Sequence, residues 1–566
     1  MSVRKGMNRR DFLRTTAVIS SGLLAAHCAP AAAPAAPEAP AEAPAEAEPM
    51  MESGGTLVWG YGQRTESNLC PIAYYGGSSD VYLRRFLSAG LVRVNSTLSG
   101  VIPDLAESWE FEGSTITFKL REGVTWHDGA PFTANDVLFT LRAMGHPESG
   151  QNYGYGDIKG LIVGMDEFKA GEAESISGVS ASDDYTVSIE MTQPFRDSFL
   201  LSIAVPTIIP EHILGEVPED TYGGAGPDVG LCKTEWGLET GVGLGPFKLS
   251  KYLHNEVVEY DPNPDYFRGA PLLDKLVYLP FIDNQALAAG LEAGEVLVGR
   301  LPSSEFERMK DMPHLRFQFP SGTATIGVAF NQHQPYLQDK RVRQALMYGL
   351  DREQFLQTVW YDLGDVPEAA FYFGEAGVSP NIRDYPYDPD KARELLAEAG
   401  WDSSQTLRLL WDDLSPFIET WFSFMIGYWK EIGVEAEPHP VGAEYASTLE
   451  ETHDWDIMPT SFGYGISANQ IRSRFDNENW LGAAYPEAVE LIDRALLAEG
   501  EEFQQIVWQL QEIAAEELPI AYHIRQAQVY AINKRVHGDE DFQPVYALMT
   551  RNYWGMEKVW VADEAS

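Results

Sequence analysis

The stretch TITFKLREGVTWHDGAPFTANDV, residues 115–137, decides the fold. Apolar and polar residues alternate from Thr115 to Leu120, which predicts a half-buried strand. Thr133, with Asp136 three residues on, is typical of a helix start, because the threonine oxygen accepts from a first-turn amide and the carboxylate faces the positive end of the helix dipole. We therefore expect a strand, a turn and a helix that ends near Met144.

The same alternation of strands and capped helices continues on both sides of this stretch. Further strands are expected at Thr56–Tyr61, Thr186–Met191, Leu276–Pro280 and Thr406–Leu410. Helices are expected after the aspartates Asp339, Asp351 and Asp388, and Gly400 ends the last of them. This mixture predicts an α/β fold, and the lack of a repeat of 20–50 residues argues against solenoids and propellers.

Length and charge narrow the classes of function. The chain has 566 residues, 44% of them hydrophobic, which is enough for two or more domains. Its formal charge is -43, and removal of residues 1–27, with five Lys or Arg and one Asp, leaves -47. Nucleic-acid binding normally requires a basic face, so we exclude a nucleic-acid partner and attribute the acidity to solubility.

The first 53 residues predict export and a tether. Arg9 and Arg10 precede Phe12, and a run of about a dozen apolar residues follows, shorter than the roughly 20 that span a bilayer. We interpret residues 1–27 as a signal peptide of the twin-arginine type. Residues 28–53 are almost pure Ala, Pro and Glu, a composition that cannot form a core and that fits a tether.

The cysteines leave two questions open. The context of Cys28 resembles a bacterial lipoprotein box, so that lipidation there would hold the protein at the outer face of the cytoplasmic membrane, although His27 stands where a small residue is usual. The alternative is an ordinary signal peptide with an incidental cysteine. Cys70 and Cys232 could pair or remain buried thiols. Neither the cysteines nor His439, His453 and His523 have metal-ligand spacing, so we expect no metal and no cofactor.

Ordered blocks over nearly the whole mature chain carry a resemblance to a known family. The blocks are Ile102–Trp109, Phe118–Gly129, Pro131–Val137, Gly243–Leu249, Asn263–Gly269, Phe330–Asn331, Asp339–Leu346, Asp351–Glu353 and Tyr387–Trp401. They are similar to the large periplasmic solute-binding proteins of peptide, nickel and related ABC importers, solute-binding protein family 5. The resemblance implies the two-lobed periplasmic-binding-protein fold of type II, in the large cluster that has an extra subdomain.

By this analogy, residues 54–320 form lobe I, with the extra subdomain at about 95–205. Residues 321–525 form lobe II, and residues 526–566 return to lobe I. The resemblance also implies a periplasmic or cell-surface receptor, monomeric by our expectation, that captures a solute between the lobes and delivers it to an ABC permease and its ATPase. Because the solute bridges both lobes, its binding shifts the population toward a closed state. An oligopeptide or dipeptide is the default solute.

Candidate ligand-binding residues are aromatic or polar side chains near strand ends and in segments that line the cleft in the family. They are Tyr61, Tyr74, Tyr75, Trp411, Asp412, Phe462, Tyr464 and Asn469. In the family's peptide binders an aspartate pairs with the peptide's amino terminus, and Gly465 occupies its place here. A buried ammonium without a counter-charge is unfavourable, so an oligosaccharide or another neutral solute is the alternative to a peptide.

Two other classes of function remain as alternatives. A secreted hydrolase could use two carboxylates, such as Asp412 and Asp456, but no spacing requires this and no Gly-x-Ser-x-Gly motif surrounds a nucleophile. A chemosensory receptor could share the fold. Trp126-His-Asp-Gly129 and the glycine-rich Gly241–Gly245 are interpreted as structural turns. We therefore predict a receptor that performs no chemistry.

Overall fold

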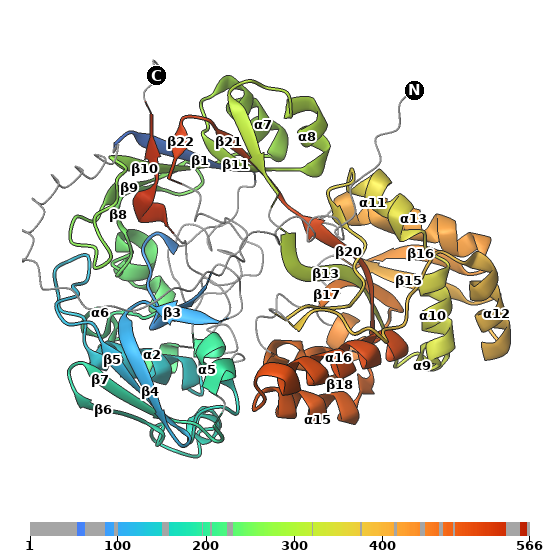
Figure 1. Cartoon of the computed structure of the whole chain (residues 1–566), viewed down its shortest axis with the longest axis horizontal. Helices are drawn as coiled ribbons and strands as arrows, with labels where there is room; N and C mark the ends of the chain where they lie inside the picture. The colour runs from blue at the N-terminus through green and yellow to red at the C-terminus, as the bar shows by residue number, and fades with distance from the viewer. Residues whose placement is uncertain are drawn as a thin grey trace, which may run out of the picture. The chain divides into compact units, whose positions relative to one another are not determined.

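The computed structural model describes residues 54–62, 85–95, 100–149, 158–194, 196–203, 207–222, 230–319, 321–373, 376–411, 416–441, 448–462, 468–478, 481–538 and 555–562. Two large sheets and one four-stranded sheet organise these residues (Figure 1). A helix long and apolar enough to cross a membrane does not occur among them.

The first large sheet has seven strands in the order β12-β21-β11-β1-β10-β9-β8. Their bounds are Leu315–Gln318, Val529–Asn533, Val298–Leu301, Thr56–Tyr61, Lys275–Pro280, Val257–Pro262 and Phe247–Leu253. β1 is parallel to both of its neighbours, and the other pairs are antiparallel. Helices α7 (Asn284–Ala293) and α8 (Ser303–Met309) follow β10 and β11 (Figure 1).

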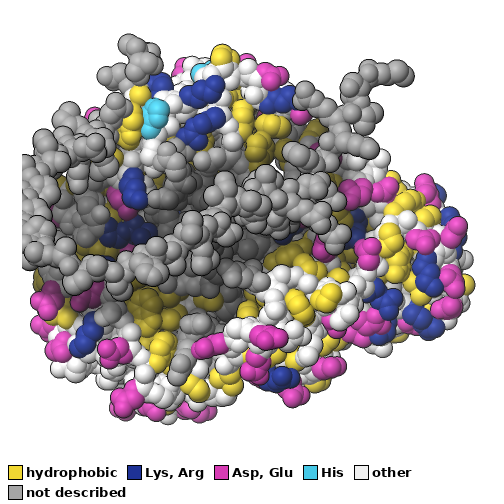
Figure 2. All heavy atoms as spheres, in the orientation of Figure 1, with side chains coloured by type: hydrophobic (Ala, Val, Ile, Leu, Met, Phe, Trp, Pro, Cys, Tyr) yellow, Lys and Arg dark blue, Asp and Glu magenta, His cyan; other side chains and the backbone are white. Residues whose placement is uncertain are grey.

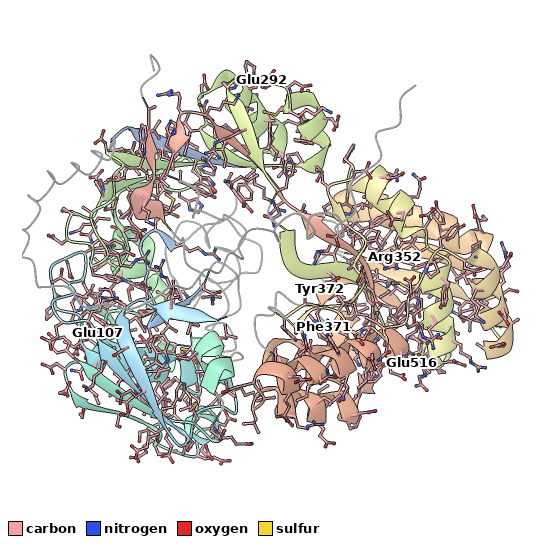
Figure 3. All side chains as sticks on the ribbon, viewed as in Figure 1. Glu107, Glu292, Arg352, Phe371, Tyr372 and Glu516 are labelled. Carbon is pink, nitrogen blue, oxygen red and sulfur yellow. The ribbon has the colours of Figure 1, made fainter. Side chains whose placement is uncertain are left out.

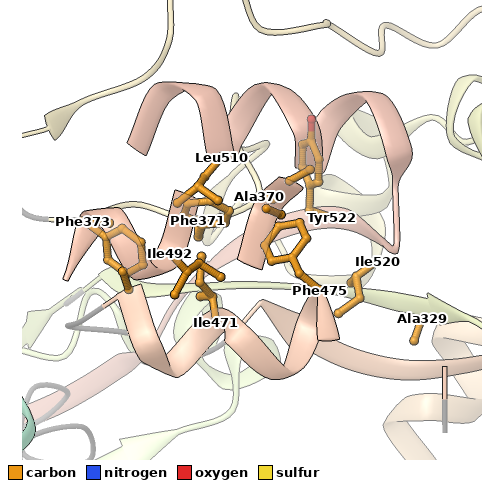
Figure 4. Close-up of a cluster of buried hydrophobic side chains, with 14 of the residues drawn as sticks. Ala329, Ala370, Phe371, Phe373, Ile471, Phe475, Ile492, Leu510, Ile520 and Tyr522 are labelled. Atoms are coloured by element: carbon orange, nitrogen blue, oxygen red, sulfur yellow. The ribbon is translucent and has the colours of Figure 1, made fainter. Parts of the chain in front are cut away.

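The second large sheet has six strands in the order β14-β20-β13-β17-β15-β16. Their bounds are Gly364–Asp365, Ile520–Ala527, Ser321–Phe330, Ile457–Phe462, Thr406–Trp411 and Glu435–Pro440. The associated helices are α9 (Pro335–Gln338), α10 (Lys340–Tyr348), α11 (Arg352–Val359), α12 (Pro389–Ala399), α13 (Pro416–Glu431), α15 (Pro486–Ala495) and α16 (Gly500–Glu517). Figure 4 shows part of their core, in which Phe371, Phe475 and Leu510 pack with little or no exposure.

The third sheet is antiparallel and corresponds to the stretch that opened the sequence analysis. Its strands β4 (Ala106–Glu112), β5 (Thr115–Leu120), β7 (Thr186–Glu190) and β6 (Val179–Asp183) lie in that order. Helix α2 (Ala134–Gly145) follows β5 and begins with the expected capping box of Thr133 and Asp136.

Shorter elements complete the described residues. They are β2 (Val92–Val94), β3 (Val101–Pro103), β18 (Asp476–Asn477), β19 (Ala483–Ala484), β22 (Val536–His537), β23 (Trp560–Val561), α4 (Met165–Lys169), α5 (Arg196–Ile203) and α6 (Glu211–Leu214). Short segments of 3-10 or π-helix occur at Glu219–Thr221, Gly230–Lys233, Trp236–Thr240, Thr448–Thr452, Ala468–Arg474 and Met556–Lys558.

The chain passes between the two large sheets twice. β12 belongs to the seven-stranded sheet and β13, which starts three residues later, to the six-stranded one. β20 belongs to the six-stranded sheet and β21 to the seven-stranded one, with Gln528 alone between them. These crossings are where a rotation of one sheet against the other would have to occur.

The strand and helix predictions are confirmed to within a residue. Thr186–Met191 ends one residue early, at Glu190, because the Met191 backbone pairs with Ile162 outside the sheet. Lys275 and Trp411 lengthen two of the predicted strands. The side chains of Asp339, Asp351 and Asp388 each accept a first-turn amide of the helix that follows.

The segment Trp126–Gly129 is a structural turn, as predicted. His127 accepts from the Gly243 amide at Nδ1 (3.1 Å), and its Nε2 lies 3.0 Å from the Gly245 carbonyl oxygen. Burial is the main reason why the pKa of His127 falls to about 4. The glycines are required by close approach, because a Cβ at Gly243 would lie 1.8 Å from the Leu87 carbonyl oxygen. This turn therefore joins the four-stranded part to the start of β8.

Candidate ligand-binding cavity

A cavity of about 790 Å³ is lined by residues of both large sheets. The first wall consists of Tyr61, Gly62, Asn284, Arg300, Leu301, Pro302, Ser303, Ser304, Gln528 and Val529. The second consists of Ile326, Thr358, Val359, Trp360, Tyr361, Ile418, Thr420, Trp421, Pro459, Thr460, Gln526 and Ala527. A volume of this size accommodates a small-molecule or short-peptide ligand.

The first wall is built at the carboxyl ends of three parallel strands. Tyr61 ends β1, Asn284 begins the helix after β10, and Leu301 ends β11. Ligands of open α/β sheets bind at such an edge, because the loops that leave it diverge and the helices that follow present their amino termini. A Cβ at Gly62 would lie 2.0 Å from the Asn284 side-chain oxygen, so a larger residue would displace the Asn284 side chain.

The polarity of the lining restricts the ligand. Among the lining residues that the structure describes, Arg300 alone carries a formal charge. The others are apolar, aromatic, hydroxyl or amide side chains, and the α7 amino terminus adds a partial positive charge beside Asn284. Such a lining suits a solute that is mainly neutral, with room for one carboxylate.

Trp421 in the second wall is fixed from behind by a buried histidine. Its indole N–H donates to Nδ1 of His523 at 3.3 Å. His523 is 1% exposed, and burial, with a smaller effect of the Arg352 charge, lowers its pKa to about 3. The imidazole is therefore neutral, with its proton on Nε2, and acts as the acceptor that orients Trp421.

Arg352, the first residue of α11, supports the same wall (Figure 3). It is 7% exposed, and its guanidinium donates to the carbonyl oxygens of Pro367, Tyr522 and Tyr385. Burial lowers the pKa of Arg352. These three carbonyl oxygens satisfy the hydrogen-bond donors of the buried guanidinium. Arg352 therefore joins α11 to β20 at Tyr522, the residue before His523, and so helps to position His523.

The structure places only some of the predicted ligand residues. Tyr61 lines the cavity, is 8% exposed and stacks on Tyr278 with ring centroids 6.3 Å apart. Trp411 ends β15 and is half-buried against the core. Its Nε1 is buried without a hydrogen-bond partner among the described residues, and Trp411 is not among the described lining residues.

The other predicted residues lie wholly or in part outside the described residues. Phe462 ends β17 and Asn469 lies in the 3-10 turn Ala468–Arg474, but their side chains are outside the described part of the structure. The remaining candidates lie wholly outside the described residues. The same holds for Cys28, Cys70 and Gly465, and the Cys232 side chain is also outside the described part. These remaining candidates are Tyr74, Tyr75, Asp412 and Tyr464.

Asp456, which the hydrolase alternative pairs with Asp412, has a structural role. Its side chain is completely buried and accepts from the Arg408 backbone amide (2.7 Å), from Arg408 Nε (2.9 Å) and from the Tyr336 hydroxyl. Arg408 also forms an ion pair with Asp454. A carboxylate that is enclosed by these donors cannot reach a substrate, so Asp456 stabilises the start of β15 and does not act as an acid or base.

Several cavity residues were missed by the sequence analysis. The strand-end rule that selected Trp411 would also have selected Asn284 and the Ser303 region, because both follow parallel strands. Gln526 and Gln528 lie at the second crossing, and no local pattern marks them. Among the described residues, no group of three metal-ligating side chains occurs.

Comparison with known proteins identifies the class of the chain. The geometry described above, with two sheets joined by crossings and a cavity lined from both, is that of a two-lobed solute-binding protein. Residues 100–477 match the family of bacterial extracellular solute-binding proteins, family 5. The chain belongs to this family, whose members are binding proteins and not enzymes.

Individual relatives cover different shares of the chain. A Brucella ovis protein, whose name describes a peptide-binding protein of an ABC transporter, is 31% identical over 381 residues; the match spans 66% of each chain, just under two thirds of that relative. The oligopeptide-binding protein AppA of Bacillus subtilis is 25% identical over 544 residues, 90% of this chain and 92% of AppA. The solved structure of AppA with a nonapeptide superposes with a TM-score of 0.70 at 23% identity, over 90% of this chain and 100% of that one.

Proposed function

We propose that this protein is the extracytoplasmic substrate-binding component of an ABC importer, and that it binds an oligopeptide in the cavity described above. The observation that carries the proposal is the lining of the cavity, which comes from both large sheets and includes Gln526 and Gln528 at the second crossing. A solute held there contacts both lobes at once. It therefore favours whichever arrangement brings the two walls together.

The chemistry of the lining supports a peptide. Amide and hydroxyl side chains can pair with peptide groups, the aromatic residues can pack on its side chains, and Arg300 with the α7 amino terminus suits its carboxylate. The relatives named for peptide binding agree with this choice. The family's peptide binders have an aspartate for the peptide's amino terminus, and this chain has Gly465 at that place. This favours a peptide whose amino end is neutral, or another solute, so an oligosaccharide is the second candidate.

We propose that residues 54–320 and 526–566 form lobe I and that residues 321–525 form lobe II. The sheet assignments support the first boundary, because β12 and β13 lie on either side of residue 320. β20 ends at Ala527 and β21 begins at Val529, so the second crossing lies at Gln528, slightly after the proposed boundary. Two short crossings permit a hinge rotation with few changes of backbone dihedrals. The permease then distinguishes the solute-bound form from the empty one.

Export and anchoring complete the proposal. Residues 1–27 act as a twin-arginine signal peptide, and cleavage before Cys28 leaves a sulfur that can carry a lipid. The Ala, Pro and Glu residues up to residue 53 then separate the folded part from the membrane. Mass spectrometry of the mature amino terminus tests this step: a diacylglycerol mass on Cys28 is expected, and an unmodified terminus beyond Cys28 contradicts it.

A thermal-shift screen of the purified protein tests the solute. The probes are a tryptic casein digest, a maltodextrin series and the nickel–histidine complex. A ligand that binds only the folded state at 100 times its Kd adds about 2.7 kcal/mol of stability. A shift with the digest alone supports the peptide assignment. A shift with maltodextrin alone makes the oligosaccharide the solute, and no shift with any probe contradicts both candidates.

A further inference from the structure

The end of helix α11 adopts an unusual backbone conformation beside the cavity. After Val359, the amides of Trp360 and Asp362 both donate to the Leu356 carbonyl, at 3.1 and 3.2 Å, which closes the helix. Tyr361 and Asp362 have positive φ angles of 56° and 60°. Glycine or asparagine usually occupies this position, because a larger side chain brings Cβ close to the carbonyl oxygen in the left-handed region.

Packing does not explain why a tyrosine stands there. The Tyr361 side chain is 45% exposed, and no hydrogen bond, ion pair or ring contact joins it to another described residue. Trp360, the residue before it, is 8% exposed and packs in the core. In the described part of the fold, no hydrogen bond, ion pair or ring contact of Tyr361 therefore offsets the strain of a tyrosine in the left-handed region.

The position of Tyr361 accounts for the residue. It lines the cavity together with Tyr61 from the seven-stranded sheet and Trp421 and Ile418 from α13. Large aromatic rings contribute contact area with little loss of conformational entropy. Strained residues of this kind are found at binding sites, where the contact that they make with ligand offsets the strain.

We propose that Tyr361 is a ligand-contacting, specificity-determining residue, whose ring packs on an apolar side chain of the bound peptide. The inference rests on the proposed function, since it names the part of the peptide that this wall recognises. If the inference holds, Tyr361→Gly should raise the stability of the empty protein and lower its affinity for the peptide.

Three substitutions separate the ring from the strain. Tyr361→Gly removes both, Tyr361→Ala removes the ring and keeps the strain, and Tyr361→Phe keeps both. Asn255→Gly is the matched control, because Asn255 also has a φ of 56° but lies in the turn between β8 and β9, outside the described lining. Each protein is melted with and without the casein digest, and the bound peptides are identified by mass spectrometry.

Without peptide, Tyr361→Gly should melt about 1–3 °C higher than wild type, and Tyr361→Ala should not. With the digest, wild type and Asn255→Gly should show the same ligand-induced shift, and Tyr361→Phe, which keeps the ring, should need less digest than Tyr361→Ala. Tyr361→Gly and Tyr361→Ala should need at least about tenfold more digest to reach the wild-type shift. The peptides retained by wild type should be richer in Phe, Tyr, Leu and Ile than those retained by Tyr361→Ala.

Two results would overturn the inference, and they can be told apart from a failure of the proposed function. An equal peptide-induced shift in wild type and Tyr361→Gly shows that the ring does not contact ligand. An unchanged or lower melting temperature of Tyr361→Gly without peptide shows that the residue is not strained. If wild type itself does not shift with the digest, the peptide assignment fails, and the inference fails with it.

Discussion

Trp421 donates its indole N–H to Nδ1 of the fully buried His523, so that a wall of the cavity is positioned by a neutral imidazole in β20. His523→Phe keeps an aromatic ring and removes the acceptor. The N–H of Trp421 would then lack this partner in the protein interior, which lowers the free energy of unfolding by about 1–3 kcal/mol. Urea unfolding followed by fluorescence measures the change. In a double-mutant cycle with Trp421→Phe, the two effects should be less than additive; strict additivity would show that the pair is not coupled.

The low pKa of His523 predicts a dependence of stability on pH. Its folded-state pKa of about 3 lies below the value of about 6.5 expected in the unfolded chain. Above pH 6.5 the imidazole is neutral in both states. As the pH falls below 6.5, only the unfolded state takes up the proton, so this residue removes about 1.4 kcal/mol of stability per pH unit until the folded pKa is reached. The free energy of unfolding of wild type should therefore fall more steeply than that of His523→Phe between pH 6.5 and 4.5. Parallel curves would contradict the assignment.

The close approach of Gly243 and Gly245, just before β8, to the backbone of Phe86 and Leu87 predicts a strong effect of added methyl groups. Ala at Gly243 or Gly245 would place Cβ 1.8 Å from the Leu87 carbonyl oxygen or 2.4 Å from that of Phe86. Each substitution should lower the free energy of unfolding by more than about 2 kcal/mol. Gly427→Ala is the control, since Gly427 lies within α13 and nothing approaches the position within 4 Å. It should raise stability by about 0.5–1 kcal/mol. Equal effects at the three glycines would disprove the close approach.

The buried Asp456 should matter for stability and not for binding. Asp456→Asn breaks a buried ion pair with Arg408 and should destabilise the fold by about 3 kcal/mol. Asp390→Asn, at a carboxylate that is 94% exposed and pairs with Arg393, should change stability by less than about 1 kcal/mol. Calorimetry on the folded proteins should give the same affinity for the casein digest in both variants and in wild type. A loss of binding in Asp456→Asn at a temperature where the variant remains folded would contradict a purely structural role.

The local elements could be predicted from the sequence, because their signals lie within a few residues. Asp388, Pro389 and Gly400 bound α12 in the structure as the sequence indicates, since a cap, a first-turn proline and a left-handed stop act over one helical turn. Exposed acidic residues on these helices pair with nearby bases, and Figure 2 shows them spread over the outer surface at the right.

The cavity could be predicted only in part, because long-range contacts decide it. Tyr61 was found because it ends a clear strand, whereas the structural role of Asp456 has no local signal, because its partner Arg408 lies 48 residues away in the sequence. Tyr361 had no sequence signal at all, since the sign of φ depends on how α11 ends. Gln526 and Gln528 gain their role from the passage of the chain between the two sheets.

Small-angle X-ray scattering with and without peptide tests the central claim most directly. The purified protein is measured empty and with the peptide fraction that gives the largest thermal shift, at a concentration that saturates binding. A solute in the proposed site would contact walls from both sheets, so we expect a smaller radius of gyration and a shorter maximum dimension in the bound form. Identical scattering profiles for the empty and the saturated protein would contradict a binding protein that closes on its solute.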